Sequence, residues 1–180
     1  MSAKTLYRAS RALAVACVEE AVELRDAGIT APILLLEGVF EAAELAPAAQ
    51  LDLWLTIGNE QQLRWLEEAA MQAPLSCWLK VDTGMHRLGV APENALLFHQ
   101  RLLASNNADK NIVTYTHFAS ADDVQSQQTQ QQLALFDALP FGSLRSAVNS
   151  AGLLAWPQAH YDWVRPGYML YGNSPLLQDH

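Results

Sequence analysis

The stretch LWLTIGNEQQLRWLEEAAMQAPLSCWLKVDT (53–83) contains the repeating unit that decides the fold. It begins with an apolar, β-rich run (53–58), continues with a helical pattern (59–71) and ends with a second β-rich run (76–83). Asn59 stands where a helix N-cap is expected. A strand, a helix and a second strand in this order predict a parallel sheet with the helix packed outside it.

The same alternation recurs along the chain, and several of its runs are almost continuously apolar, as is typical of buried parallel strands. We expect strands at 12–18, 32–38, 53–58, 76–83, 111–118, 145–150 and 162–172, and helices at 19–27, 59–71, 92–105 and 126–139. Such regular crossovers fit a (β/α)8 TIM barrel better than a doubly wound sheet, because no GxGxxG follows the first strand. A closed barrel typically needs about 250 residues. The 180 residues therefore predict an α/β fold, an incomplete (β/α)8 barrel that forms a single partial domain over 1–180.

Composition narrows the function classes. The net charge is −8, from 19 acidic and 11 basic residues, which disfavours nucleic acid and anionic membranes as partners. No apolar stretch reaches the roughly 20 residues of a membrane span, and the N-terminal segment (1–15) does not resemble a secretory signal, so we expect a cytoplasmic protein. Cys17 and Cys77 lie in apolar runs without metal-ligand spacing; we expect buried free thiols and no metal site. The Gln-rich tract (120–133) is either disordered or an acidic loop followed by a helix.

Polar residues interrupt the apolar pattern at the ends of the middle strands, where TIM barrels carry their chemistry. Lys80 lies within the strand run 76–83, and Arg87 follows a turn. Lys80 either pairs with Asp82 or, together with Arg87, points into the barrel mouth to bind an anion or tune a cofactor. His117 ends the next strand, where it is either a structural histidine or a functional one.

Two further groups follow the later strands. Asn149 and Ser150 either cap a helix or help to seat a phosphate. Arg165 interrupts an apolar run before Pro166-Gly167, and a buried guanidinium needs an acceptor. That acceptor is either an acid such as Asp162, or a ring nitrogen or phosphate of a ligand.

These blocks, in this order, resemble the alanine racemase family over essentially the whole chain. The blocks KVDTGMHRLG (80–89) and DWVRPGYMLYG (162–172) are each specific, and the other matching blocks are VEEAVELRDAGI (18–29), PILLLEG (32–38), THFASAD (116–122) and VNSAG (148–152). The family is a homodimeric pyridoxal 5'-phosphate enzyme, with a (β/α)8 barrel followed by a β-rich domain. It interconverts L- and D-alanine for peptidoglycan synthesis.

The resemblance implies a cofactor site. Arg165 matches the arginine that hydrogen-bonds the pyridine nitrogen of pyridoxal 5'-phosphate. Ser150 and the backbone N–H groups of Gly167 and Tyr168 match the phosphate site, with Asn149 beside it.

The resemblance also implies roles in catalysis. Lys80 and Arg87 match catalytic positions: Arg87 lies near the cofactor phenolic oxygen and the substrate carboxylate. Lys80 is carbamylated in many members, which would give an anion able to orient Arg87. His117 matches a residue packed by the cofactor ring near Arg165.

Some parts of the family pattern are absent. The family's cofactor lysine lies in a first strand of the type VVKANAYGHG, which this sequence lacks, and none of Lys4, Lys80 and Lys110 fits that position. The C-terminal β domain, with its catalytic tyrosine, is also absent. We therefore expect the chain to be inactive alone. The alternatives are a non-catalytic module that binds pyridoxal phosphate, or a non-functional remnant of the barrel with open edges along 12–18 and 162–172.

Overall fold

The computed structural model describes Thr5 and residues 10–177, and the chain divides into two compact units. Unit 1 comprises the described residues up to Leu79 together with Phe98–Ile112, and unit 2 comprises Lys80–Leu97 and the described residues from Val113 onward. Lys4, which the sequence analysis excludes as the cofactor lysine, lies outside the described residues.

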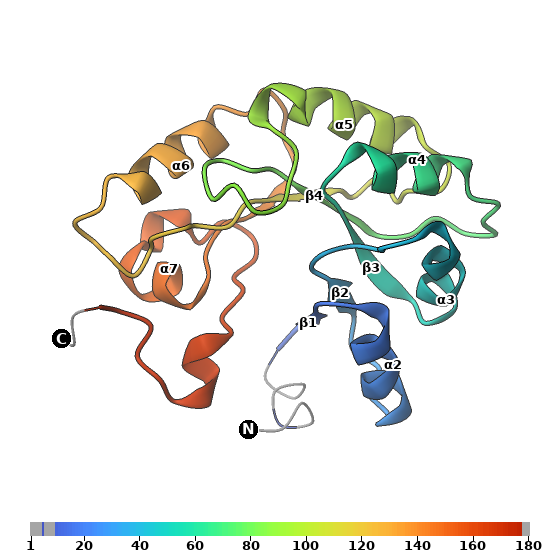
Figure 1. The fold of residues 1–180 in the computed structure, drawn as a ribbon, viewed down its shortest axis with the longest axis horizontal. Helices are drawn as coiled ribbons and strands as arrows, with labels where there is room; N and C mark the ends of the chain where they lie inside the picture. Colours follow the sequence, from blue (N-terminus) through green and yellow to red (C-terminus); the bar gives the residue numbers. More distant parts are fainter. Residues whose placement is uncertain (1–4, 6–9, 178–180) are drawn as a thin grey trace. The chain divides into compact units, whose positions relative to one another are not determined.

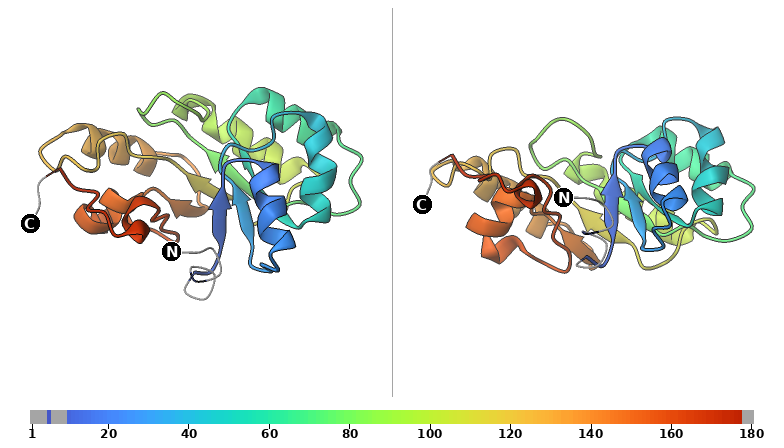
Figure 2. Two further views of the ribbon diagram at one scale, coloured as in Figure 1. Left: turned by 60° about the horizontal axis from the view of Figure 1, so that its bottom comes forward. Right: turned by 90° about the horizontal axis from the view of Figure 1, so that it is seen from below.

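Unit 1 is built from parallel strands that pair in chain order, with helices between them. Its elements are β1 (Leu13–Val15), α2 (Val18–Asp26), β2 (Ile33–Leu35), η1 (Ala42–Glu44), α3 (Leu45–Gln50), β3 (Leu53–Ile57), α4 (Glu60–Glu68) and β4 (Cys77–Lys80), whose last residue belongs to unit 2. Helices α2, α3 and α4 lie on the same side of β1, β2 and β3 (Figures 1 and 2). This is the arrangement that the strand–helix–strand pattern predicts.

The core of unit 1 explains why its strands read as continuous apolar runs. Val15, Leu35, Leu55 and Cys77 stand in register across neighbouring strands. Side chains of β2 that point to opposite faces of the sheet are buried alike, as with Leu34 and Leu35. Each fully buried leucine contributes roughly 1.5–3 kcal/mol relative to exposure, so this sheet needs cover on both faces.

Unit 2 contains β5 (Val113–Tyr115) and β6 (Leu144–Ser146), which pair in parallel. The segment that follows β4 joins them, because the backbone N–H of Val81 donates to the carbonyl of Tyr115 at 2.8 Å. The helices are α5 (Pro92–Ala104), which belongs partly to each unit, α6 (Gln128–Asp137), α7 (Ser150–Ala155), η2 (Pro157–Ala159) and η3 (Tyr168–Tyr171).

Several expectations need correction. The strand expected at 162–172 is wrong: Trp163 forms only an isolated bridge to Ser146, and η3 follows the break at Pro166-Gly167. Because proline lacks an N–H group, it cannot extend a ladder there. The sequence analysis missed η1 and α3. The Gln-rich tract resolves as a loop followed by α6.

The cysteines differ from each other. Cys77 is a buried free thiol, as expected, and burial raises its pKa to about 12. Cys17 is only half-buried, contrary to expectation.

In the part of the chain that the structure describes, no helix is long and apolar enough to cross a membrane. Within the same residues, His, Cys, Asp and Glu side chains do not gather in a group of three or more that would hold a metal ion.

Candidate functional site

All of the predicted site residues lie in unit 2, and several of them share one small hollow. The residues that line this hollow are Lys80, Val81, Asp82, Met85, Arg87, Leu88, Thr116 and His117. They come from the end of β4, the loop after it and the turn after β5. The strand ends therefore bring together side chains far apart in sequence, as a parallel sheet does.

The loop that carries Arg87 closes back on the strand it leaves. The N–H of Asp82 donates to the carbonyl of Val90 at 2.8 Å, and the N–H of Val90 donates to the carbonyl of Lys80 at 2.9 Å. Gly89 permits this closure: its φ is +122°, and an added Cβ would lie 2.8 Å from the backbone nitrogen of Asp82. Arg87 thus sits in a loop pinned at both ends.

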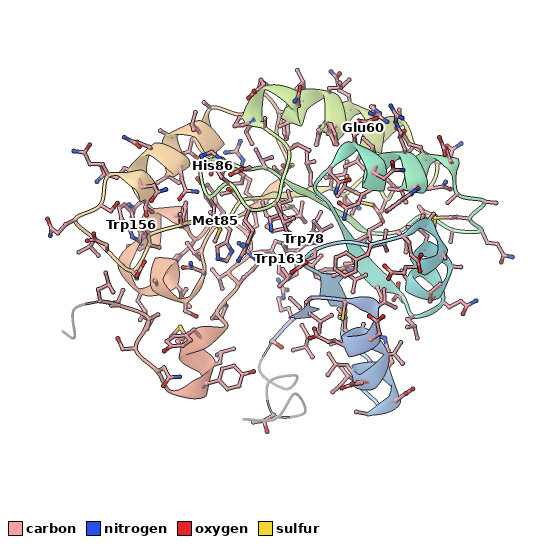
Figure 3. All side chains as sticks on the ribbon, in the orientation of Figure 1. Glu60, Trp78, Met85, His86, Trp156 and Trp163 are labelled. Atoms are coloured by element: carbon pink, nitrogen blue, oxygen red, sulfur yellow. The ribbon has the colours of Figure 1, made fainter. Side chains whose placement is uncertain are left out.

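Asp82 organises the same loop from inside. Its Oδ1 atom accepts the N–H groups of Gly84, Met85 and His86, each at 3.0 Å, while Oδ2 lies 3.2 Å from His86 Nδ1. Figure 3 shows Met85 and His86 in this loop. Burial opposes ionisation, but the N–H donors of His86 and Gly84 hold the pKa of Asp82 below its ordinary value. The Asp82 carboxylate is therefore ionised and hydrogen-bonded within its own loop.

Tyr115 of β5 is a common neighbour of two cations. Lys80 Nζ lies 5.5 Å from the centroid of the Tyr115 ring, and Arg165 Cζ lies 5.0 Å from it. Both distances are within the range of cation–π attraction. Tyr115 and Lys80 are buried, at 1% and 6% exposure, so this aromatic face helps to hold positive charge away from solvent.

Arg165 is held by strand-end acceptors rather than by an acid of its own segment. Its guanidinium donates to Ser146 Oγ at 2.7 Å and to the carbonyl of Thr116 at 2.6 Å. Asp162, the acid that the sequence suggested, instead accepts the backbone N–H of Arg145. Burial lowers the pKa of Arg165 to about 10, so the guanidinium keeps its proton at neutral pH.

His117 lies among these cations. Burial, followed by the charges of Arg165, Arg87 and Lys80, lowers the pKa of His117 to about 3. The imidazole is therefore neutral at neutral pH. Its Nδ1 atom is 3.4 Å from Arg165 Nη2, and its Nε2 atom is 3.5 Å from Asn149 Nδ2. Because Arg165 can only donate, Nδ1 is the acceptor in the first contact.

Ser150, Asn149 and the segment after Pro166 form a second group of hydrogen-bonding residues. The hydroxyl of Ser150 accepts the N–H of Gly167 at 2.9 Å and that of Met169 at 3.2 Å. Asn149 caps α7 by accepting the N–H of Gly152 at 2.9 Å, which is one of the two roles that the sequence left open. Tyr168 is 59% exposed, and its role stays a prediction.

The structure thus brings Lys80 and Arg165 together over Tyr115, with His117 beside Arg165. Arg87 lines the hollow that Lys80 and His117 also line. The sequence analysis did not identify Tyr115, Ser146 or Met169 as neighbours of the site. For Tyr115 a signal existed, since strand alternation places it on the same face as His117. For Ser146 and Met169 the contacts depend on tertiary structure.

Comparisons with known proteins show which family the chain resembles. The profile of the alanine racemase N-terminal domain family matches residues 1–175. The catabolic alanine racemase of Pseudomonas putida is 52% identical over 168 residues, which cover 91% of this chain and 46% of that protein. The biosynthetic alanine racemase of Escherichia coli is 47% identical and covers 97% of this chain and 49% of that protein.

A solved structure gives the same picture. The biosynthetic alanine racemase from Pseudomonas aeruginosa superposes with a TM-score of 0.91 at 44% identity, over 98% of this chain and 49% of that one. The fold is therefore an incomplete α/β barrel of the kind found in the N-terminal part of these enzymes. The chain spans about half the length of the curated relatives it matches.

Proposed function

Because this chain belongs to the alanine racemase family, we propose that it forms part of the active site of a pyridoxal 5'-phosphate-dependent enzyme that interconverts L- and D-alanine. Residues 1–180 contribute to a single barrel domain, and the enzyme works as a cytoplasmic homodimer in peptidoglycan synthesis. The observation that carries the proposal is the cluster of Lys80, Arg87 and Arg165 around a neutral His117.

The chemistry of this cluster suits the cofactor. A phosphate group and an unprotonated pyridine nitrogen both need hydrogen-bond donors, and the cluster is rich in donors and positive charge. The carboxylate that lines the hollow, Asp82, is already occupied by N–H groups of its own loop. An added Cβ at Gly167 would meet no atom of the described chain within 4 Å, so there is open space beside this N–H group.

Arg165 is the residue we assign to the pyridine nitrogen. Pyridoxal 5'-phosphate, when bound, supplies an electron sink that makes the α-proton of an amino acid acidic. Arg165 donates a hydrogen bond but keeps its proton, because even a pKa of about 10 leaves it charged at neutral pH. Arg165 thereby limits the electron withdrawal, which favours return of a proton to the same carbon over other reactions.

Ser150 and its neighbours are the residues we assign to the phosphate. The hydroxyl of Ser150 accepts two backbone N–H groups and keeps its own proton to donate. The N–H groups of Gly167 and Tyr168, with the Asn149 amide beside them, complete the proposed set. The Gly167 N–H donates to Ser150 Oγ in this structure, and a bound phosphate would share it with that oxygen.

Lys80 and Arg87 are the residues we assign to substrate and catalysis. Arg87 binds the substrate carboxylate near the phenolic oxygen of the cofactor. A carbamylated Lys80 orients Arg87, since it replaces a buried cation with an anion.

The proposal is tested by titrating the protein with pyridoxal 5'-phosphate. Absorbance and fluorescence report the binding. Arg165→Ala is expected to weaken binding about tenfold or more, because a charge-assisted donor is lost. Arg145→Ala is the matched control: Arg145 lies in the same unit but donates to Asp137, and we expect binding to change little. Chiral chromatography of L-alanine incubated with the protein measures racemisation. Because the chain lacks the cofactor lysine, we expect binding without racemisation, and absence of binding would refute the proposal.

A further inference from the structure

Helix α6 begins within the Gln-rich tract, and two of its glutamines, one turn apart, contact the loops of the site. Gln132 is 1% exposed and Gln128 is half-buried, whereas Gln131 beside them is exposed. A buried carboxamide is costly unless its donors and acceptor are bonded. The partners of these side chains therefore indicate what the tract does.

Gln132 is bonded through both ends of its amide. Its Oε1 atom accepts the N–H of Ala119 at 2.9 Å. Its Nε2 atom donates to the carbonyl of His117 at 3.0 Å and to Thr83 Oγ1 at 3.4 Å. One side chain thus contacts the turn after β5 and the loop after β4.

Gln128 makes a parallel pair of contacts. Its Oε1 atom accepts the hydroxyl of Ser120 at 2.6 Å, and its Nε2 atom donates to the carbonyl of Gly84 at 3.2 Å. Gly84 and Ser120 belong to the same loop and turn that Gln132 holds.

The two segments also meet directly beneath the glutamines. Thr83 and Thr116 share a hydrogen bond of 2.7 Å between their hydroxyls. Gly84 has a φ of +137°, and an added Cβ would lie 3.3 Å from Gln132 Cγ. The loop therefore packs closely against the Gln132 side chain at the point where it turns toward Arg87.

We propose that Gln132, supported by Gln128, is a positioning residue that holds the loop bearing Arg87 against the strand end bearing His117. The choice of pyridoxal 5'-phosphate as the test ligand rests on the proposed function. The positioning role itself rests on the hydrogen bonds of Gln132 and Gln128. A glutamine suits the task because its amide donates and accepts at once. It also places no charge beside His117, whose ring is neutral.

The experiment compares Gln132→Met, Gln132→Glu and the control Gln131→Met in the protein as encoded. Thermal unfolding first establishes that each variant is folded. Pyridoxal 5'-phosphate titration is expected to show binding weakened about tenfold by either Gln132 change and unchanged in Gln131→Met. The affinity of Gln132→Glu relative to wild type should rise as the pH falls from about 8 to about 5. The introduced carboxyl, once protonated, can donate a hydrogen bond as well as accept one, as the glutamine amide does.

Nuclear magnetic resonance of the His117 ring, without any ligand, separates this inference from the proposed function. We expect its signals to shift in Gln132→Met and to stay in place in Gln131→Met. Unshifted His117 signals, or wild-type affinity in a folded Gln132→Met, would overturn the inference. Failure of the wild-type protein to bind the cofactor would refute only the proposed function, since the ring signals still decide the positioning role.

If Gln132→Met does not fold, Gln128→Met replaces it in the experiment. Because Gln128 is half-buried and holds the same two segments, we expect a change of the same sign but only about threefold in affinity, with shifted His117 signals. Ring signals identical to wild type in this variant would also overturn the inference.

Discussion

Both units fix the loops after their strands with a buried glutamine from a neighbouring helix. In unit 1, Gln62 of α4 accepts the N–H of Gly58 at 2.9 Å and donates to the carbonyls of Glu37 at 2.7 Å and Val39 at 3.2 Å. Gln132 of α6 does the same in unit 2, with its oxygen on one turn and its nitrogen reaching another loop. The carboxamide clamp is thus a repeated device of this fold.

The two clamps differ in what their loops carry. The partners of Gln62 are all backbone atoms of the segments after β2 and β3. The segments held by Gln132 carry Arg87 and His117 of the candidate site. We therefore expect the device to serve stability in unit 1, and both stability and site geometry in unit 2.

Gly38→Ala should break the unit 1 clamp and have the largest effect. An added Cβ would lie 2.4 Å from the carbonyl oxygen of Thr56 and 2.5 Å from Gln62 Nε2, at a φ of +77°. We expect a loss of about 4 kcal/mol in the free energy of unfolding, measured by urea denaturation. Gly28→Ala is the control, because its φ is +80° but an added Cβ meets no described atom within 4 Å. Backbone strain alone should cost it about 1 kcal/mol, and equal losses would show that neither the Thr56 nor the Gln62 contact adds to the cost.

Gln62→Met sharpens the comparison directly. It removes the three hydrogen bonds of the clamp and leaves buried backbone groups unsatisfied, so we expect a loss of about 2–3 kcal/mol in urea denaturation. In contrast to Gln132→Met, it should leave the ring signals of His117 unshifted. Exposed Gln61, changed to Met, controls for the loss of an amide from α4. A shift of the His117 signals in Gln62→Met would contradict the division of roles between the clamps.

The sequence predicts the clamped elements better than the clamps. The runs at 32–38 and 53–58 contain β2 and β3, and the pattern at 59–71 contains α4, because burial on both faces of a strand and amphipathic spacing leave a local signature. The run at 162–172 is equally apolar but is not a strand, since hydrophobicity does not report whether a ladder partner exists. Its Pro166-Gly167 pair was the signal that argued against a strand.

The candidate site was predictable as a set of residue types but not as a network. Arg165 needed a buried acceptor on elementary grounds, yet the acceptors proved to be Ser146 and a backbone carbonyl rather than Asp162. The glutamines of 120–133 looked like compositional bias, because a hydrogen bond between residues as far apart as Gln132 and Thr83 has no local signature.

His117 makes the stability of unit 2 depend on pH. Its pKa is about 3 when folded and has an ordinary value of 6.5, so below pH 6.5 the unfolded chain binds the extra proton. Stability contributed by the neutral ring is therefore complete above that pH and is lost as the pH falls toward 3. Between about pH 7 and about pH 5 we expect the wild type to lose about 1–2 kcal/mol more than His117→Asn.

Urea denaturation at the two pH values measures this difference. The pKa of His99, in α5 of unit 1, is also lowered, by burial. Because His99 is present in both proteins, its contribution cancels from the difference between them. If wild type and His117→Asn lost equal stability on acidification, neither the burial of the His117 ring nor the cations around it would be lowering its pKa.

Thr129→Val should have the smallest effect and the opposite sign. Thr129 lies three residues before Gln132, is fully buried, and its hydroxyl has no hydrogen-bond partner among the described residues. Asn59 also lies three residues before a clamping glutamine, but it is the N-cap of α4, and its side chain accepts the Gln62 N–H. Because valine keeps the shape and removes an unsatisfied hydroxyl, we expect a gain of about 0.5–1 kcal/mol in the free energy of unfolding and unchanged His117 signals.

Thr114→Val is the matched control for this change. Thr114 is equally buried in unit 2, but its hydroxyl accepts the Ser143 hydroxyl at 2.8 Å. Removing a bonded hydroxyl leaves its partner unsatisfied, so we expect a loss of about 1 kcal/mol. A loss of similar size in Thr129→Val would mean that its hydroxyl is bonded in solution. In that case α6, like α4, would use the position before its glutamine to support the clamp.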